Sequence, residues 1–165
     1  MTDCVRTGQL GRALRLAAFV SVTALLSAPV QAGQCPADKV SPGARTSGEM
    51  KPKDVTDNVL GQVELAKEKV NLADRRLRLR KLVLQPSGIV PWHSHDDRPA
   101  IIYVVSGTVE EYASNCSVPI VHKTGEVSVE KMGVQHWWKN TSKSPVVLLS
   151  ADLFHDEKNA DEHMM

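Results

Sequence analysis

Short apolar segments separated by turn residues constrain the fold of this chain most strongly. Residues 75–84 (RRLRLRKLVL) alternate charged and aliphatic side chains, which is the period of two of a half-buried strand. Residues 101–105 (IIYVV) are β-branched or aromatic, and Ser106-Gly107 closes this segment. Similar short runs follow at 108–112, 127–129, 136–139 and 146–149. Many short strands with turn signals between them predict an all-β sandwich or barrel.

Two segments of this β region allow more than one interpretation. The apolar positions of residues 62–72 fit a helix or short strands equally well, and nothing caps a helix there. In residues 76–80, the three even-numbered arginines occupy one face and Leu77 and Leu79 the other, and the alternation slips near Lys81, which suggests a bulge or the strand end. The arginine face either binds anions or faces solvent, and the usual exposure of arginine favours solvent. Residues 85–88 (QPSG) are expected to form a turn.

The first 32 residues have the organisation of a secretory signal peptide. Arginines precede an uncharged apolar run at residues 16–26, and residues 27–32 (SAPVQA) end in a small-x-small-like pattern. The run is shorter than the ~20 residues of a membrane-spanning helix, and no stop-transfer pattern follows it. We therefore expect cleavage after Ala32 and an exported protein, periplasmic or secreted, that no longer contacts the membrane. The alternatives are a retained anchor and a lipid anchor at Cys35, which the bulky Gln34 disfavours.

The expected organisation is a signal peptide at 1–32, a flexible lead-in at 33–54, a β-barrel at 55–155 and a tail at 156–165. The start of the lead-in is rich in Pro, Gly, Ser and Lys. Signal cleavage leaves two cysteines, Cys35 and Cys116. Two cysteines in an exported chain predict one disulfide, which would close a loop of about 80 residues. The alternative is two unpaired thiols.

The charge balance excludes an electrostatic basis for binding nucleic acid. The chain has 20 basic and 19 acidic residues and a formal net charge of +1. Only 4% of the residues are aromatic, so aliphatic side chains must fill most of the core. A Gly-rich phosphate loop, a Cys-x-x-Cys pair and a Gly-x-Ser-x-Gly motif are all absent from the sequence, which leaves these chemistries without support.

The clearest chemical signal comes from histidines. His93 and His95 are separated by one residue in an expected strand, so both point to one face, about 6.6 Å apart. Two imidazoles placed in this way can bind one metal ion at about 2.0–2.1 Å each. The His-x-His spacing alone is weak, because it also occurs by chance. A third histidine, His136, lies in a second cluster that contains Gly125, Gly133 and Asn140.

Two glycine-bounded motifs make the chain resemble the cupins, a family of small β-barrels. The first cupin motif, G-(x)5-H-x-H-(x)3,4-E-(x)6-G, is matched by residues 88–107 (GIVPWHSHDDRPAIIYVVSG), with one residue fewer after the first glycine. The second, G-(x)5-P-x-G-(x)2-H-(x)3-N, is matched by residues 125–140 (GEVSVEKMGVQHWWKN), with Lys131 in place of proline. The resemblance, to a small secreted cupin of the Cupin_2 type, implies a single-domain jelly-roll barrel (a double-stranded β-helix) over residues 55–155.

The resemblance also implies a set of metal ligands. Three histidines fall at the family's metal-binding positions: His93, His95 and His136. Ala100 falls at the family's metal-binding glutamate, and alanine cannot bind a metal, so the expected site has no carboxylate from that position. Asp97 would replace it only if the strand continued past His95, which the following Arg98-Pro99 disfavours.

We expect the three histidines to bind one divalent transition metal ion, which could be Fe, Mn, Ni, Cu or Zn because imidazole suits all of these. The alternative is a barrel that has lost its metal, but convergent imidazoles are costly to bury unpaired. Three protein ligands leave coordination positions open, as in catalytic sites. The positive ion should attract a small anionic ligand. The other histidines are expected at the surface: His122, His155 and His163.

Several side chains are candidates for the pocket around this ion. Trp138 shares the face of His136 and either walls the pocket or fills the core. Arg98 either meets a substrate anion or pairs with Asp96 or Asp97. Three further positions share one face of the expected strand and would line an apolar interior: Ala100, Ile102 and Val104.

Two functions remain open at this stage. Several cupins with similar three-histidine sites are iron-dependent dioxygenases, so the resemblance implies an exported, metal-dependent oxidoreductase that acts on a small organic anion. The missing glutamate and the lack of an obvious general base favour instead a non-catalytic module that binds a metal or a small ligand. Cupins often pair as dimers, so a homodimer is also implied, although no residue of this sequence demonstrates it.

Overall fold

The computed structural model describes residues 33–155, so the expected signal peptide, the expected C-terminal tail and His163 lie outside the described residues. The described strands are β1 (Lys53–Glu64), β2 (Arg75–Ser94), β3 (Ala100–Ser106), β4 (Thr108–Ala113), β5 (Ile120–Lys123), β6 (Val127–Glu130), β7 (Gln135–Lys139) and β8 (Val146–His155). Two short 3-10 helices accompany them, η1 (Ala37–Lys39) and η2 (Leu65–Lys67). Within residues 33–155, no helix has the length and apolar character needed to cross a membrane.

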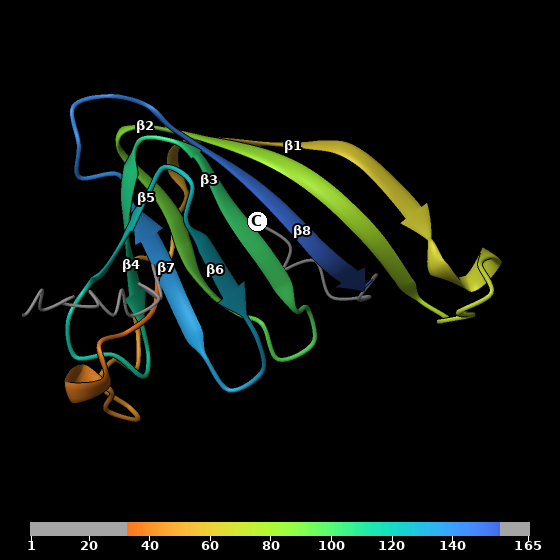
Figure 1. Ribbon diagram of the computed structural model, residues 1–165, viewed down its shortest axis with the longest axis horizontal. Helices are drawn as coiled ribbons and strands as arrows, with labels where there is room; N and C mark the ends of the chain where they lie inside the picture. Colours follow the sequence, from red (N-terminus) through yellow and green to blue (C-terminus); the bar gives the residue numbers. More distant parts are fainter. Residues whose placement is uncertain (1–32, 156–165) are drawn as a thin grey trace, which may run out of the picture. The chain divides into compact units, whose positions relative to one another are not determined.

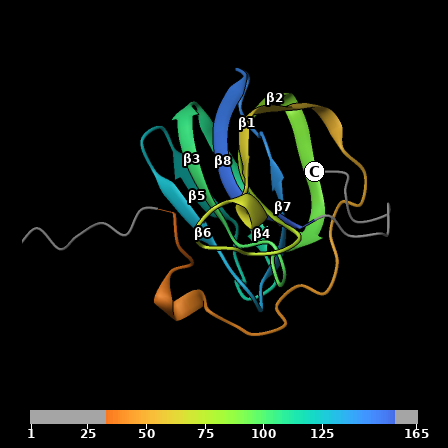
Figure 2. The same cartoon turned by 90° about the vertical axis from the view of Figure 1, so that its right-hand side faces the viewer.

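The strands form an antiparallel barrel with one interior. Their order is β5-β4-β7-β2-β8-β3-β6, and β1 pairs with β2 outside this path. Strand β2 joins the two sides, because residues 75–84 pair with β8 whereas residues 89–94 pair with β7. The strands consequently curl around a common core, and β1 with the first half of β2 extends beyond it as a ribbon (Figures 1 and 2). The expected all-β jelly-roll barrel is confirmed.

Residues 85–88 form a corner inside β2, so the expectation of a turn between two strands is wrong. The chain bends here but continues as one strand, whose partner changes from β8 before the bend to β7 after it. A Cβ atom on Gly88 would lie only 2.8 Å from the backbone oxygens of Asp54 and Gln85. Only glycine therefore fits at this close approach of β1 to the bend.

The first half of β2 buries the face that the sequence assigned to solvent. Arg80 is 6% exposed, whereas Leu77 and Leu79 are 47% and 40% exposed. Arg80 forms ion pairs with Asp57 on β1 and Asp152 on β8. Buried charges require such partners, and these partners come from distant parts of the chain. The prediction of a solvated arginine face is wrong for this reason.

The barrel core is mainly aliphatic, as the low aromatic content predicted. Its buried residues are Leu82, Leu84, Val90, Ala100, Ile102, Val104, Val109, Trp138, Val146 and Leu148. A second cluster next to the disulfide contains Ala113, Cys116 and Ile120. Of the ambiguous residues 62–72, the first three complete β1 and the next three form η2.

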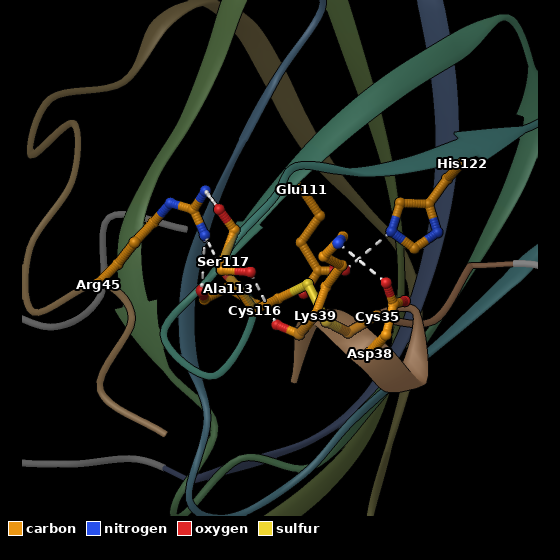
Figure 3. The surroundings of a disulfide bond; sticks show 9 residues. All are labelled: Cys35, Asp38, Lys39, Arg45, Glu111, Ala113, Cys116, Ser117 and His122. Atoms are coloured by element: carbon orange, nitrogen blue, oxygen red, sulfur yellow. Dashed lines mark hydrogen bonds and ion pairs between the residues drawn. A yellow bond between two sulfur atoms is a disulfide. The ribbon is translucent and has the colours of Figure 1, made fainter. Parts of the chain in front are cut away.

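The residues before β1 lie against the barrel and are held there covalently. A disulfide joins Cys35 to the buried Cys116, as the sequence predicted (Figure 3). The backbone of Val40 forms a β-bridge with Cys116. The guanidinium of Arg45 donates to the backbone oxygens of Ala113, at 3.1 Å, and of Cys116. Disulfides of this kind are typical of proteins that fold in oxidising compartments.

Candidate metal centre

Strands β2 and β7 bring three histidine rings together inside the barrel. His93 and His136 are directly paired across the two strands, and His95 follows two residues after His93. The ring centroids are 4.7 Å apart for His93 and His136, 4.8 Å for His93 and His95, and 5.0 Å for His95 and His136. The three histidines singled out by the motifs therefore lie in one cluster.

The outer nitrogen of each ring has a hydrogen-bond acceptor. His93 Nδ1 lies 2.8 Å from the backbone oxygen of Pro91, and His95 Nδ1 lies 2.6 Å from that of Arg98. His136 Nδ1 lies 2.6 Å from Oε1 of Glu111. Because a carbonyl or carboxylate oxygen can only accept, each neutral ring carries its proton on Nδ1 and directs the lone pair of Nε2 into the cluster. This is the tautomer that a metal ligand needs.

Glu130 adds a carboxylate to the cluster. Its Oε2 atom lies 2.8 Å from His95 Nε2, and its Oε1 atom lies 3.6 Å from His136 Nε2. The ligand atoms of the four residues all lie within 4.8 Å of one another. Glu130 on β6 is the direct partner of Ala100 on β3. The carboxylate that the motif lacks at Ala100 is thus supplied by the neighbouring strand.

Sequence reasoning missed Glu130 because strand register is a tertiary property. The only available signal was the alternation in residues 127–130, which places Ser128 and Glu130 on one face. Nothing in the sequence indicated that this face would meet Ala100. Asp97, the substitute considered, instead binds Arg75, with Oδ2 3.1 Å from Nη1, and also pairs with His155.

Several nitrogen and oxygen atoms of the cluster, of the kinds that bind cations, have no hydrogen-bond donor among the described residues. His93 Nε2 and His95 Nε2 lie 2.9 Å apart, although the hydrogen bonds described above leave no proton on either atom. His136 Nε2 and Glu130 Oε1 are buried and have no hydrogen-bond partner among the described residues. Buried polar atoms without partners are costly. A metal ion among these four groups would satisfy all of them, so the residues present fit such a group.

The protonation of the cluster follows from burial and from its carboxylates. Burial lowers the pKa of His93 well below its ordinary value, and the neighbouring His136 and His95 lower it further. Burial also acts to lower the pKa of His136, but Glu130 and Glu111 outweigh it, and the pKa is raised. A histidine with a low pKa stays neutral, as metal binding requires.

Glu111 connects the cluster to a second buried histidine, His122. Its Oε2 atom lies 2.8 Å from His122 Nε2. Burial acts to raise the pKa of Glu111, but the hydrogen bonds from His122 and His136 lower it to about 2. His122 is fully buried on β5, so the expectation that it lies at the surface is wrong. Its carboxylate partner explains the burial. His155 is partly exposed.

A cavity of about 370 Å³ adjoins the cluster. His95, Glu130 and His136 contribute to its wall, together with Lys131 and Glu111. Its remaining lining comes from the residues near the disulfide and from β5 and β6: Gly33, Gln34, Cys35, Val40, Ala113, Asn115, Ile120, Ser128, Val129 and Val134. The cluster is therefore accessible to a small molecule from this side.

The pocket candidates from the sequence occupy different places. Trp138 and Ile102 line a smaller cavity, to which His93 and Glu130 of the cluster also contribute. Trp138 additionally belongs to the core and stacks on His122, with ring centroids 4.5 Å apart. Ala100 and Val104 are buried in the core, and neither lines the two cavities described.

Arg98 is also not among the residues that line the two cavities described. Its guanidinium is 3.8 Å from the carboxylate of Asp152. Neither of the two neighbours considered from the sequence, Asp96 and Asp97, is its ion-pair partner, since Asp96 accepts from the backbone of Gly133 and Asp97 pairs with Arg75. Burial lowers the pKa of Arg98.

Comparisons with known proteins agree with this architecture. Residues 80–152 match the family model described as Cupin domain (Cupin_2). Germin-like protein subfamily 2 member 2 of Arabidopsis thaliana is 34% identical over 76 residues, which are 44% of this chain and 35% of that protein. The chain therefore spans only about a third of the length of this curated relative.

Two solved structures support the fold. A predicted oxalate decarboxylase of Thermotoga maritima has a TM-score of 0.51 at 19% identity and covers 73% of this chain and 98% of that one. A conserved protein with a double-stranded β-helix domain from Klebsiella pneumoniae has a TM-score of 0.50 at 17% identity, over 65% of this chain and 84% of that one. At these identities the similarity concerns the fold alone.

Proposed function

The chain belongs to the cupin superfamily through its residues 80–152, and on this premise we propose that it is an exported, metal-dependent enzyme acting on a small organic anion. The observation that carries the proposal is the convergence of three imidazole Nε2 atoms and the Glu130 carboxylate beside a cavity of about 370 Å³. We propose that these four side chains hold one divalent transition metal ion. Export is supported by the disulfide and by the sequence of residues 1–32.

The donor set favours a redox-active or Lewis-acidic metal over a purely structural ion. Imidazole suits Fe, Ni, Cu and Zn, and the added carboxylate also suits Mn. Four protein ligands leave coordination positions open for most of these metals, and open positions are a feature of catalytic sites. A bound metal would supply Lewis acidity and, for Fe, Mn or Cu, one-electron chemistry.

The surroundings of the cluster favour a small anion as the ligand. Three neutral imidazoles and one carboxylate would leave a divalent ion with one excess positive charge among its own ligands. Lys131 adds a further positive charge to the wall of the same cavity, at the position where the cupin motif has proline. The cavity's size suits a molecule of a few heavy atoms up to a small ring. We propose small carboxylates as the first class to test.

A second candidate function is a metal-bearing module that binds an anion without turnover. It is favoured by the fact that Glu111, among the described residues lining the cavity, already accepts hydrogen bonds from both His122 and His136. Glu111 is the carboxylate of this lining that is not a proposed metal ligand. Because both of its oxygens already accept hydrogen bonds, it is not free to act as a general base. Catalysis would have to rely on the metal and on Lys131.

The test begins with the metal content of protein purified from its own export compartment. We expect about one transition metal ion per chain, and reconstitution with Mn, Fe, Co, Ni, Cu and Zn then identifies the active form. Oxygen uptake and carbon dioxide release are measured over a panel of small mono- and dicarboxylates, enolisable acids and thiols. His136→Ala is expected to lose both the metal and any turnover.

The outcomes separate the two candidates. Product formation that depends on the metal supports the enzyme. Stoichiometric metal with anion binding but no product from any loaded form supports the binding module. A folded protein that takes up none of these metals would contradict both.

A further inference from the structure

Glu111 divides its two carboxylate oxygens between two buried histidines. Oε1 lies 2.6 Å from Nδ1 of His136, and Oε2 lies 2.8 Å from Nε2 of His122. The side chain is nearly inaccessible, with 5% of the residue exposed. Glu111 is on β4, His136 on β7 and His122 on β5, so three adjacent strands meet at this carboxylate.

His122 is built to hold Glu111 in place. Its ring is fully buried and stacks on Trp138 at 4.5 Å and an angle of 25°. Its Nδ1 atom has no hydrogen-bond partner in the part of the chain that the structure describes, and Gly33 lies directly against this side of the ring. A proton on Nδ1 would thus be buried without an acceptor. The ring therefore carries its proton on Nε2 and donates it to Glu111 (Figure 3).

We propose that Glu111, oriented by His122, is a positioning residue that sets the strength and geometry of the metal site through His136. This inference rests on the proposed metal site. By accepting the proton of His136 Nδ1, the carboxylate fixes the ring with Nε2 directed at the other ligands and makes this nitrogen a stronger donor. His93 and His95 donate instead to backbone carbonyl oxygens, which carry no charge. His136 is thus the one ligand of the three with an anionic partner on its outer nitrogen.

The matched variants separate this role from simple core filling. Glu111→Gln keeps the shape and one acceptor but removes the charge, and His122→Phe keeps the stacking on Trp138 but removes the donor. Glu110→Gln is the control, since Glu110 is on the same strand but accepts from the hydroxyl of Tyr112, at 2.5 Å, and contacts none of the cluster. Each full-length mature protein is loaded with Zn²⁺ or Co²⁺ in competition with a chelator.

We expect Glu111→Gln to weaken Zn²⁺ and Co²⁺ binding by roughly 10–100-fold, the range typical of lost outer-shell partners of metal-bound histidines. The visible absorption bands of the Co²⁺ form should shift, because the ligand field of His136 changes. His122→Phe should move the affinity and the bands in the same direction by a smaller amount. Glu110→Gln should change neither.

The result that would overturn the inference is a folded Glu111→Gln or His122→Phe protein with wild-type affinity and wild-type Co²⁺ bands, even if its apo form melts at a lower temperature. If Glu111→Gln does not fold, the decision rests on His122→Phe and its spectrum. Failure of the wild-type protein to bind either ion would instead contradict the proposed function, so the two failures are distinguishable.

Discussion

Ala100 and Glu130 are direct partners on the antiparallel strands β3 and β6, and both side chains are buried. Paired side chains on one face of a sheet have Cβ atoms about 4.5–5.5 Å apart. A carboxylate on either strand can therefore reach the same histidines. At the residue scale, whether the cluster contains a carboxylate therefore depends on positions 100 and 130 together, and not on position 100 alone.

This pairing predicts that the carboxylate can be moved between strands. Glu130→Ala should weaken metal binding by roughly 100-fold or more, at least the effect of losing an outer-shell partner. In that background, Ala100→Glu should recover part of the affinity, because the new side chain starts from the partner position. Chelator competition with Zn²⁺ measures each affinity. Ala100→Gln in the same background adds similar bulk without charge and should recover little. Wild-type affinity in Glu130→Ala would contradict the assignment of Glu130.

At the scale of the elements, the corner of β2 depends on Asn140 at the end of β7. The Asn140 side-chain nitrogen lies 3.0 Å from the backbone oxygen of Leu84, 3.1 Å from that of Gln85 and 2.8 Å from that of Ser144. Its oxygen accepts from Ser142. Asn140 is fully buried, and so is its hydrogen bond to Leu84, whereas its bonds to Gln85 and Ser144 are partly buried.

Asn140→Ala should therefore destabilise the fold and leave the metal site largely intact. We expect a loss of about 2–3 kcal/mol in the free energy of unfolding, since one buried and two partly buried backbone oxygens lose a partner worth about 1 kcal/mol each. Urea denaturation of the apo protein measures this loss. The metal affinity of the folded variant should change little, because four strand residues, or about 13 Å, separate Asn140 from His136. Ser142→Ala, which removes one partly buried hydroxyl partner, should cost less than Asn140→Ala.

How much the sequence could predict differs between these scales. The period of two and the glycine-bounded motifs were sufficient for the barrel and for the three histidines, because both are local patterns. Glu130, the burial of His122 and the inward face of Arg80 depend on strand register and on distant carboxylates. Residues 85–88 are of the types that favour turns, but the bend they form lies inside one continuous strand. Strand β8 pairs with β2 before the bend, β7 pairs with it after the bend, and β1 pairs with it on both sides.

At the scale of the whole described unit, the disulfide attaches residues before β1 to the barrel and to its larger cavity. Cys35 and Cys116 are separated by 81 positions in sequence. Gly33, Gln34 and Cys35 line the same cavity as the histidine cluster. Further along, the backbone nitrogen of Trp92 donates to the backbone oxygen of Glu49 at 2.6 Å. The segment is therefore part of the wall around the site, although it contributes none of the four clustered ligands.

Removing the disulfide should lower stability and open this wall without abolishing metal binding. A bridge that closes a loop of this length contributes about 2–4 kcal/mol, mainly by restricting the unfolded chain. We expect Cys35→Ser combined with Cys116→Ser to lose stability in this range by urea denaturation. Trypsin should also cleave faster after Lys39 in the folded variant, because the segment is then held only by weaker contacts such as those of Arg45. The metal content should stay near one ion per chain.

The wild-type protein treated with dithiothreitol is the matched comparison for this variant. It should show a similar loss of stability and similarly faster cleavage, since both preparations lack the covalent link and differ only in carrying thiols or hydroxyls at positions 35 and 116. Equal stability of the variant and the oxidised wild type would show that loop closure contributes nothing. Loss of the metal from a variant that remains folded would mean that the residues around Cys35 support the ligands themselves, contrary to the placement of the four ligands on and beside β2, β6 and β7.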